Sequence, residues 1–554
     1  MPQQFNSNAR VWDMIMQRTH SWPRWRRSPL LAIALLATIS SAPSGSAEAG
    51  SSELQQTAIA TSGQLRVSPN GRMLVNNAGR AAFLAVDSNW AGLAYALNRN
   101  NVITFLDARK KQKFNAISIT CLQWNGWTKA DGSLLGWTTN YYGDDSHNRD
   151  GMGRPIPDQP KTTVGNNPNN AGAYDFWDHI DYIITQAANR SMWVNIIPTW
   201  GSWISGSHNG RNTSDIVFNT TNAYKYGHFL GSRWQNHTNL FWSFDSDRNV
   251  NYGSHNDKRA VVRALAEGIA DGFNGQPVKS QDGKAVWGTT LMTQHPRKNE
   301  RTSSQWLHGD AWLDLNAVQA WPGNQFSGNA QQGDQITAIL GDWAKAPAKP
   351  TFLIEGRWEN FTSSWDRYSQ RLQAYSTVFA GGAAHFYNTH DMMGEKLLDG
   401  TWRTAINTAS ALDMKHLFTY MDTQLPNAHH LNRVHYPAMI NGSLGTVQGT
   451  SSQAPGGDRI VPMRSGGGTM GHIYISNGRN VKLKMSTFTP NGGTKNAYWY
   501  NPRDGKWCNG VGTCSTTKAA FKRGIPSGTG HPDVVFDPPG FPARGNDWVL
   551  LLQP

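Results

Sequence analysis

The predicted fold is decided by the stretch Asn239-Leu240-Phe241-Trp242-Ser243-Phe244-Asp245-Ser246-Asp247-Arg248-Asn249. An apolar run ends here in two carboxylates and an arginine, which is typical of a buried strand whose C-terminal end opens into a polar site. A second apolar run ends in the same way, in Pro350-Thr351-Phe352-Leu353-Ile354-Glu355-Gly356-Arg357-Trp358-Glu359-Asn360. Two buried strands that each deliver an acid at the C-terminal end favour a parallel α/β barrel with paired carboxylates for acid–base chemistry.

The alternation of strand and helix signals continues on both sides of these stretches. Further strands are expected at 82–86, 116–124, 192–198, 286–292, 313–318 and 384–387, and helices at 100–113, 173–190, 220–234, 258–273, 368–379 and 404–421. A hairpin around Pro69-Asn70-Gly71 precedes them, and a long loop without periodicity spans 125–170. Eight strand signals, each followed by a helix or a polar loop, predict a (β/α)8 TIM barrel over residues 63–436.

A different pattern follows a Pro- and Gly-rich connector at residues 437–457. Apolar and polar residues alternate with period two, and Asn477-Gly478 and Asn491-Gly492 mark turns. This pattern predicts a small all-β sandwich domain over residues 458–554. Cys508 and Cys514 flank a flexible loop in which we expect a disulfide, whereas Cys121 ends an apolar run and is expected to be an inert core thiol.

The N-terminus has the three parts of an export signal. Residues 18–27 carry four arginines and no acid, residues 30–39 are an apolar run, and small residues lead to Ala49. We therefore expect a signal peptide at 1–49, a linker at 50–62, and a secreted or periplasmic protein without stable membrane insertion. An uncleaved anchor and a later start methionine remain open alternatives.

Composition limits the classes of ligand. The chain of 554 residues has 24 Trp and 16 Tyr but only 16% charged residues. This composition is expected either of a protein that binds flat ligands such as sugar rings or of one with an aromatic-rich core. The formal charge of +13 suits an acidic polymer or an ordinary solvated surface. The sequence has no basic run with interleaved aromatics for nucleic acid, and no ligand spacing for a metal, so neither a nucleic acid nor a cofactor is expected.

Several of these stretches together resemble the apiosidase-like glycoside hydrolases, over roughly residues 63–420. In chain order they are Phe83-Leu84-Ala85-Val86-Asp87-Ser88-Asn89-Trp90, residues 174–182, Pro198-Thr199-Trp200-Gly201, residues 222–227, Arg233-Trp234, residues 239–248, His295-Pro296, Gln319, Glu355 and residues 380–385. The C-terminal stretches 499–505 and 547–550 look like the β-domain that often follows this barrel and carries a "collagen-binding" name.

The resemblance implies a retaining glycoside hydrolase with an Asp acid/base after the fourth strand and a Glu nucleophile after the seventh. By motif these residues are Asp247 and Glu355. The chain departs from the family's usual Gly-Gly-Asp-Arg, because it has Asp245-Ser246-Asp247-Arg248. Asp245 could raise the pKa of Asp247 and keep it protonated, act as the acid itself, or pair with Arg248 and shape the loop. The departure also suggests a substrate other than apiose linked in pectin.

Further candidates stand at the strand ends, each with a structural alternative. Asp87 and Trp90 would line the pocket or brace its loop, and Glu359 is expected at the surface. Three tryptophans could stack on sugar rings or belong to the core instead: Trp124, Trp200 and Trp321. Three polar residues could bind sugar hydroxyls or serve only the internal structure: His295, Gln319 and His385.

The sequence as a whole predicts an exported, monomeric glycoside hydrolase that acts on a plant or bacterial polysaccharide, acidic ones included. One alternative is a carbohydrate-binding protein whose barrel has lost its activity. Another is an adhesin in which the β-domain is the working part and the barrel is secondary.

Overall fold

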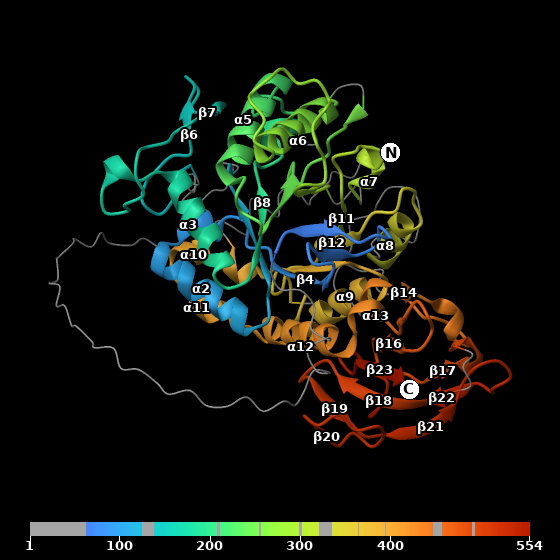
Figure 1. Ribbon diagram of the computed structural model, residues 1–554. Helices are drawn as coiled ribbons and strands as arrows, with labels where there is room; N and C mark the ends of the chain where they lie inside the picture. The colour runs from blue at the N-terminus through green and yellow to red at the C-terminus, as the bar shows by residue number, and fades with distance from the viewer. Residues whose placement is uncertain are drawn as a thin grey trace, which may run out of the picture.

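The computed structural model describes residues 63–123, 138–207, 211–253, 256–297, 302–320, 335–363, 365–393, 395–446, 457–489 and 493–554 (Figure 1). The expected signal peptide and linker lie outside these residues, as do Trp124 and Trp321. Among the described residues, no helix is both long enough and apolar enough to cross a bilayer.

Eight parallel strands form the predicted barrel. Each except β10 pairs with the next along the chain, and the last pairs with the first: β4 (Leu84–Asp87), β5 (Ala116–Thr120), β8 (Trp193–Ile197), β9 (Leu240–Phe244), β10 (Leu291–Gln294), β11 (Asn316–Gln319), β12 (Thr351–Glu355) and β13 (Ala384–Tyr387). Between β10 and β11 the ring is closed by hydrogen bonds from the Asp314 amide to the Met292 carbonyl (3.0 Å) and from Thr293 Oγ1 to the Leu315 carbonyl (2.8 Å). The (β/α)8 prediction is confirmed.

The helices begin where the sequence supplies caps. Asn98, Asn219 and Thr408 accept hydrogen bonds from the first turns of α2, α5 and α12, and Asp175 forms a capping box with Asp178 at the start of α3. The longer helices are α2 (Arg99–Lys111), α3 (Phe176–Ala188), α5 (Thr220–Trp234), α6 (Arg259–Phe273), α8 (Gln335–Trp343), α9 (Arg367–Phe379) and α12 (Ala409–Gln424). Short turns are η1 (Gly92–Ala96), η2 (Ala171–Ala173), α4 (Ser202–Ser205), α7 (Ser304–Leu307), η4 (His390–Met392), α10 (Glu395–Leu398), α11 (Trp402–Ala405), α13 (Asn427–Leu431), η5 (Pro437–Met439) and η6 (Met485–Thr487).

The barrel interior is filled by alternate residues of the strands. Residues such as Leu84, Phe241, Phe352 and Phe386 form one buried cluster, while their neighbours in sequence pack outward against the helices. The N-terminal end is closed by the predicted hairpin, now a small antiparallel sheet of β1 (Leu65–Val67), β2 (Leu74–Asn76) and β3 (Ala81–Ala82). The interior is therefore a packed core, and its open end is the C-terminal end of the strands.

Three sequence predictions differ from the structure in detail. The strand expected at 286–292 begins only at Leu291, after Gly288 with a positive φ of 81°. The helix expected at 404–421 is divided into α11 and α12, because Thr408 is the extended cap of the second helix. The loop expected at 125–170 contains a hairpin of β6 (His147–Arg149) and β7 (Pro155–Pro160), whose Pro and Asp residues hide its strand character.

The C-terminal domain consists of two antiparallel sheets over one apolar core. The larger sheet has the order β14 (Val434–His435), β15 (Ile460–Arg464), β16 (Gly471–Ile475), β23 (Trp548–Gln553), β18 (Thr494–Asn501), β19 (Lys506–Cys508) and β20 (Cys514–Ser515), with β21 (Lys522–Pro526) also paired to β18; the smaller sheet pairs β17 (Val481–Leu483) with β22 (Val534–Phe536). Ile473, Leu483, Trp499 and Phe536 meet in the shared core. The predicted β-sandwich is confirmed.

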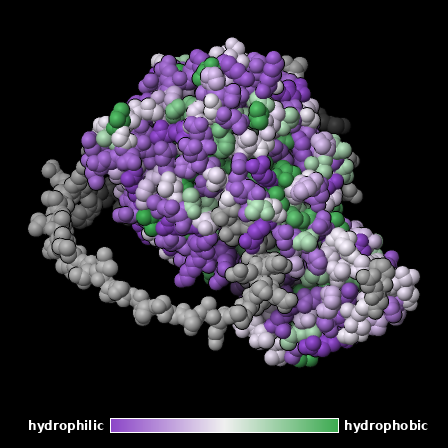
Figure 2. Space-filling view, viewed as in Figure 1, coloured by the Kyte–Doolittle hydropathy of each residue, from purple (hydrophilic) through white to green (hydrophobic). Residues whose placement is uncertain are grey.

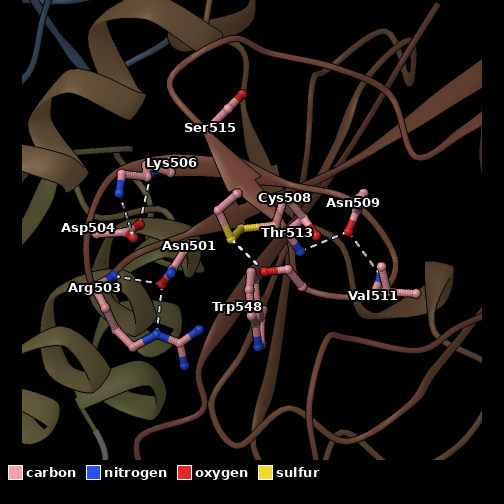
Figure 3. Close-up of a disulfide and its surroundings, with 12 residues drawn as sticks. Asn501, Arg503, Asp504, Lys506, Cys508, Asn509, Val511, Thr513, Ser515 and Trp548 are labelled. Atoms are coloured by element: carbon pink, nitrogen blue, oxygen red, sulfur yellow. Dashed lines mark hydrogen bonds and ion pairs between the residues drawn. A yellow bond between two sulfur atoms is a disulfide. The ribbon is translucent and has the colours of Figure 1, made fainter.

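The expected disulfide joins Cys508 and Cys514, which are opposite each other on β19 and β20 (Figure 3). Within the loop that it closes, Asn509 Oδ1 accepts hydrogen bonds from the amides of Val511 and Thr513. Cys121 is a buried free thiol, as expected. On the face shown in Figure 2 the barrel surface is mainly hydrophilic, with hydrophobic residues in small separate spots.

Candidate active site

The loop after β9 has an unusual backbone. Asp245 and Asp247 have φ angles of 53° and 55°, a left-handed conformation that Asp tolerates better than most L-residues. Glycine would adopt the same conformation without steric cost. Gly201 lies directly against the loop, since a Cβ atom there would be 2.6 Å from Arg248 Cβ and 2.7 Å from Asp245 Oδ1.

The two aspartates of this loop have different environments. Asp245 is completely buried, and its carboxylate accepts a hydrogen bond from Ser205 Oγ at 3.3 Å. The side chain of Asp247 is 30% exposed, and Arg248 Nη1 donates to its Oδ2 at 2.9 Å. Arg248 thus forms an ion pair with Asp247, and Asp247 is the more exposed of the two aspartates.

The pKa of Asp247 is lowered from its usual value. Burial raises the pKa, but the positive charges of Arg248, Arg297 and His295 and a hydrogen bond from Gln319 together lower it by more. The pKa is therefore lowered, whereas one alternative open from the sequence was that Asp245 could raise it. The Asp247 carboxyl group therefore ionises more readily than an ordinary aspartic acid in the unliganded protein.

Glu355 owes its orientation to an irregularity in β12. Val318 pairs with Leu353, but the next residue, Gln319, pairs with Glu355, so β12 contains one extra residue at this point. Phe352 belongs to the interior cluster, and strict alternation would therefore turn Glu355 outward toward the helices. The bulge instead places Glu355 opposite Gln319 and on the same face.

Gln319 and His295 connect the two carboxylates. Gln319 Nε2 donates to Asp247 Oδ1 at 3.2 Å, while its strand neighbour is Glu355. His295 Nε2 lies 3.1 Å from Glu355 Oε2, and the other ring nitrogen, Nδ1, is 3.1 Å from Ser246 Oγ. Four strand ends, those of β9 to β12, thus contribute to a single polar cluster of Asp247, His295, Gln319 and Glu355.

An aromatic wall stands beside this cluster. The Trp90 ring is 5.2 Å from that of Trp358, 5.7 Å from that of Trp200 and 6.2 Å from that of His295, measured between centroids. All three indoles are buried in the unliganded protein, each with at most 5% of its surface exposed. Trp358 was missed in the sequence analysis, although it follows Glu355 by only three residues.

Two sequence candidates lie on the other side of the strands. Asp87 forms a buried ion pair with Arg109 of α2 at 2.5 Å and accepts a hydrogen bond from the Asn89 amide, which is the geometry of the loop-bracing alternative. His385 alternates with Ala384 and Phe386, which face the interior, so its own side chain is on the helix side of β13. Burial lowers the pKa of His385 to about 3, and its ring is neutral at physiological pH.

Glu359 is buried and not at the surface, contrary to the sequence prediction. Its Oε2 accepts hydrogen bonds from Tyr387 Oη at 2.5 Å and Thr408 Oγ1 at 2.6 Å. It therefore ties the loop after β12 to the start of α12 and is engaged in structure. Trp124 and Trp321 lie outside the described residues.

The arrangement suits acid–base chemistry on a bound ligand. A reachable carboxylate, a second carboxylate beside an imidazole, and an indole wall are together at the open end of the barrel. Within the described ranges, no group of three or more His, Cys, Asp or Glu side chains could hold a metal ion.

Comparison with protein families gives two matches that together span nearly all of the folded chain. A family model described as "Apiosidase-like, catalytic domain" matches residues 68–450. A second model, whose description names a collagen-binding domain of a collagenase, matches residues 450–553. Among curated proteins, none matches this sequence.

Solved structures with the same architecture include a protein titled "Glycoside hydrolase", with a TM-score of 0.66, 24% identity, and coverage of 89% of this chain and 97% of that chain. Another is a glycoside hydrolase family 5 protein from Bacteroides vulgatus, with a TM-score of 0.66, 24% identity, and coverage of 89% and 93%. These likenesses extend over both domains and show the shared fold.

Proposed function

Because the chain belongs to the family of apiosidase-like glycoside hydrolases, we propose that it cleaves a glycosidic bond with retention of configuration, Asp247 being the acid/base and Glu355 the nucleophile. The observation that carries this proposal is the polar cluster, in which Gln319 contacts Asp247 and pairs with the strand residue Glu355. Two acids that converge from the C-terminal ends of β9 and β12 are what this chemistry requires.

The reaction would have two steps. In the first, the Glu355 carboxylate attacks the anomeric carbon while Asp247 gives its proton to the leaving oxygen, which breaks the glycosidic bond and forms a glycosyl ester. In the second, Asp247 takes a proton from water as the water attacks the same carbon, and Glu355 leaves as a carboxylate. Asp247 is then protonated again and Glu355 is again a free carboxylate, as they were before the first step.

The lowered pKa of Asp247 restricts when the first step can occur. An ionised Asp247 cannot protonate the leaving oxygen, so a substrate must displace the remaining water from its partly exposed side chain and raise the pKa. Burial is already the largest influence on this pKa and acts in the required direction. A substrate that covers Asp247 would therefore activate its own acid.

The substrate we propose is a plant or bacterial polysaccharide, acidic ones included. Support comes from the positive formal charge of the chain, which suits an acidic polymer, and from the indoles of Trp90, Trp200 and Trp358, whose exposed edges border the polar cluster. The N-terminal charge and hydrophobicity pattern supports export to the periplasm or the medium, where such polymers occur.

A panel of polysaccharides, including acidic pectins and bacterial exopolysaccharides, tests the proposal. Wild type, Asp247→Asn, Glu355→Gln and the control Asp257→Asn are compared for released sugars; Asp257 is an exposed acid further along the same connection. We expect products from wild type and control only. Carbohydrate binding by wild type without any product would instead assign the chain a binding role.

A further inference from the structure

Helix α9, which follows β12, is buried on all sides. Every residue from Tyr368 to Phe379 is buried, although an outer helix of a barrel normally keeps one face in solvent. Figure 1 shows the reason: α9 lies between the barrel strands and the C-terminal sheet. The helix is thus shared by the two domains.

One face of α9 contacts the C-terminal domain through residues at helical spacing. Tyr368 Oη donates to the Ser476 carbonyl at 2.9 Å, and the Tyr375 ring is stacked on Tyr474 at 5.1 Å. Between them, Arg371 Nε and Nη2 donate to both oxygens of Asp547, at 2.9 and 2.8 Å. These contacts join the helix to strands β16 and β23.

The ion pair of Arg371 is inaccessible to water. The side chain of Arg371 is 4% exposed and that of Asp547 is 0% exposed, and Arg371 Nη1 also donates to buried Asp413 at 2.7 Å. Burial alone would lower the pKa of Arg371, but the two carboxylates raise it above its usual value. Breaking such a pair leaves a charge buried without compensation, so this contact holds α9 firmly.

The opposite face of α9 holds the backbone that follows Glu355. Gln373 Oε1 accepts a hydrogen bond from the Arg357 amide at 2.6 Å, and Gln370 Nε2 donates to the Arg357 carbonyl at 3.1 Å. Gly356 permits this close approach, since a Cβ atom there would lie 2.5 Å from Gln373 Cδ. Arg357 is two residues after Glu355 and one before Trp358.

We propose that the C-terminal domain is a positioning element of the active site: Asp547 fixes Arg371 and hence α9, and Gln370 and Gln373 on α9 fix the loop that carries Glu355 and Trp358. Gln370, Gln373, Arg371 and Asp547 are then positioning residues that touch no substrate. This inference rests on the proposed role of Glu355.

A domain that served only to bind a ligand would not need this connection. Appended binding modules are joined to their enzymes by exposed linkers and modest polar interfaces. Here the interface is completed by a fully buried ion pair, and its helix is in direct contact with the backbone beside Glu355. The connection between the domains and the catalytic loop is thus continuous.

Hydrogen exchange of the full-length protein tests the inference without any substrate. In Gln373→Met, which removes the acceptor but no charge, we expect the amide of Arg357 and the peptide around it to exchange at least tenfold faster. Asp547→Asn should have the same effect from the other domain. The control Arg544→Gln breaks an exposed interdomain ion pair between Arg544 (41% exposed) and Asp366 (40% exposed). It should leave the exchange of the Arg357 amide and of the surrounding peptide unchanged.

Kinetics provide the second readout. Gln373→Met should lower kcat about tenfold or more, with KM nearly unchanged, because the misplaced group acts only in the bond-breaking step. Unchanged exchange around Arg357 in Gln373→Met and Asp547→Asn would overturn the inference; if Asp547→Asn does not fold, Gln373→Met decides alone. If the two variants exchange faster around Arg357 but wild type hydrolyses no substrate, the proposed function is refuted and the positioning role of the C-terminal domain still holds.

Discussion

At the scale of single residues, Arg248 controls the protonation of Asp247. Its Nη1 atom donates to Asp247 Oδ2 at 2.9 Å and to the Asp247 carbonyl at 2.7 Å. The attraction of this charge is one cause of the lowered pKa of Asp247. Since the acid must be protonated in the first step, kcat/KM should fall as the pH rises through this lowered pKa.

Arg248→Gln should therefore move the alkaline limb of the kcat/KM profile to higher pH. Without the guanidinium, the pKa of Asp247 rises, and the protonated form survives to a higher pH. The profile is measured on wild type, Arg248→Gln and Arg259→Gln, the last of which removes an exposed arginine paired with Asp257. A limb that stays in place, or moves to lower pH, would contradict the role of Asp247 as the acid.

At the scale of elements, helices α5 and α6 pack with their backbones in contact. Gly227 and Gly231 of α5 face Gly268 and Gly272 of α6, and a Cβ atom at Gly231 would lie 2.7 Å from the Phe273 amide nitrogen and overlap the Ile269 carbonyl. Because the obstacle is backbone, an added methyl group must push the helices apart.

Gly231→Ala should consequently destabilise the protein by about 1–3 kcal/mol, the usual cost of overpacking. Gly341 of α8 is the matched control, because an added Cβ would meet nothing within 4 Å there. Gly341→Ala should stabilise by about 0.4–1 kcal/mol through the better helix propensity of alanine. Chemical denaturation measures both, and equal effects of the two substitutions would contradict the packing argument.

The elements themselves were largely predictable, since apolar strands with acidic ends and helices with period 3.6 carry their own signals. The bulge of β12 was not, because it depends on how β12 pairs with β11 and leaves no mark in the sequence around Ile354. The site residues divide accordingly. The sequence places Asp87, His295 and Gln319 at or next to the C-terminal end of a strand, and His385 within one. It does not show which face of the strand each side chain occupies, and in the structure Asp87 and His385 face the helices.

At the scale of the whole molecule, α9 belongs to both domains and links their stabilities. The barrel cannot keep α9 in place if the C-terminal sheet unfolds, because Arg371 would lose Asp547 in a buried site. We expect calorimetry of the full chain to give one unfolding transition that includes both domains, with equal calorimetric and van't Hoff enthalpies. Two separate transitions would show that the domains are thermodynamically independent.

The most direct test of the central claim uses an activated glycoside of the sugar that wild type releases. Asp247→Ala and Glu355→Ala are each incubated with this substrate in the presence of azide, and the configuration of the glycosyl azide is determined. If Glu355 is the nucleophile, its removal leaves room for azide to attack the sugar directly, and the glycosyl azide has inverted configuration. If Asp247 is the acid/base, its variant still forms the glycosyl ester, and azide then gives retained configuration. Absence of rescue in both variants, or the same configuration from both, would contradict the assigned roles.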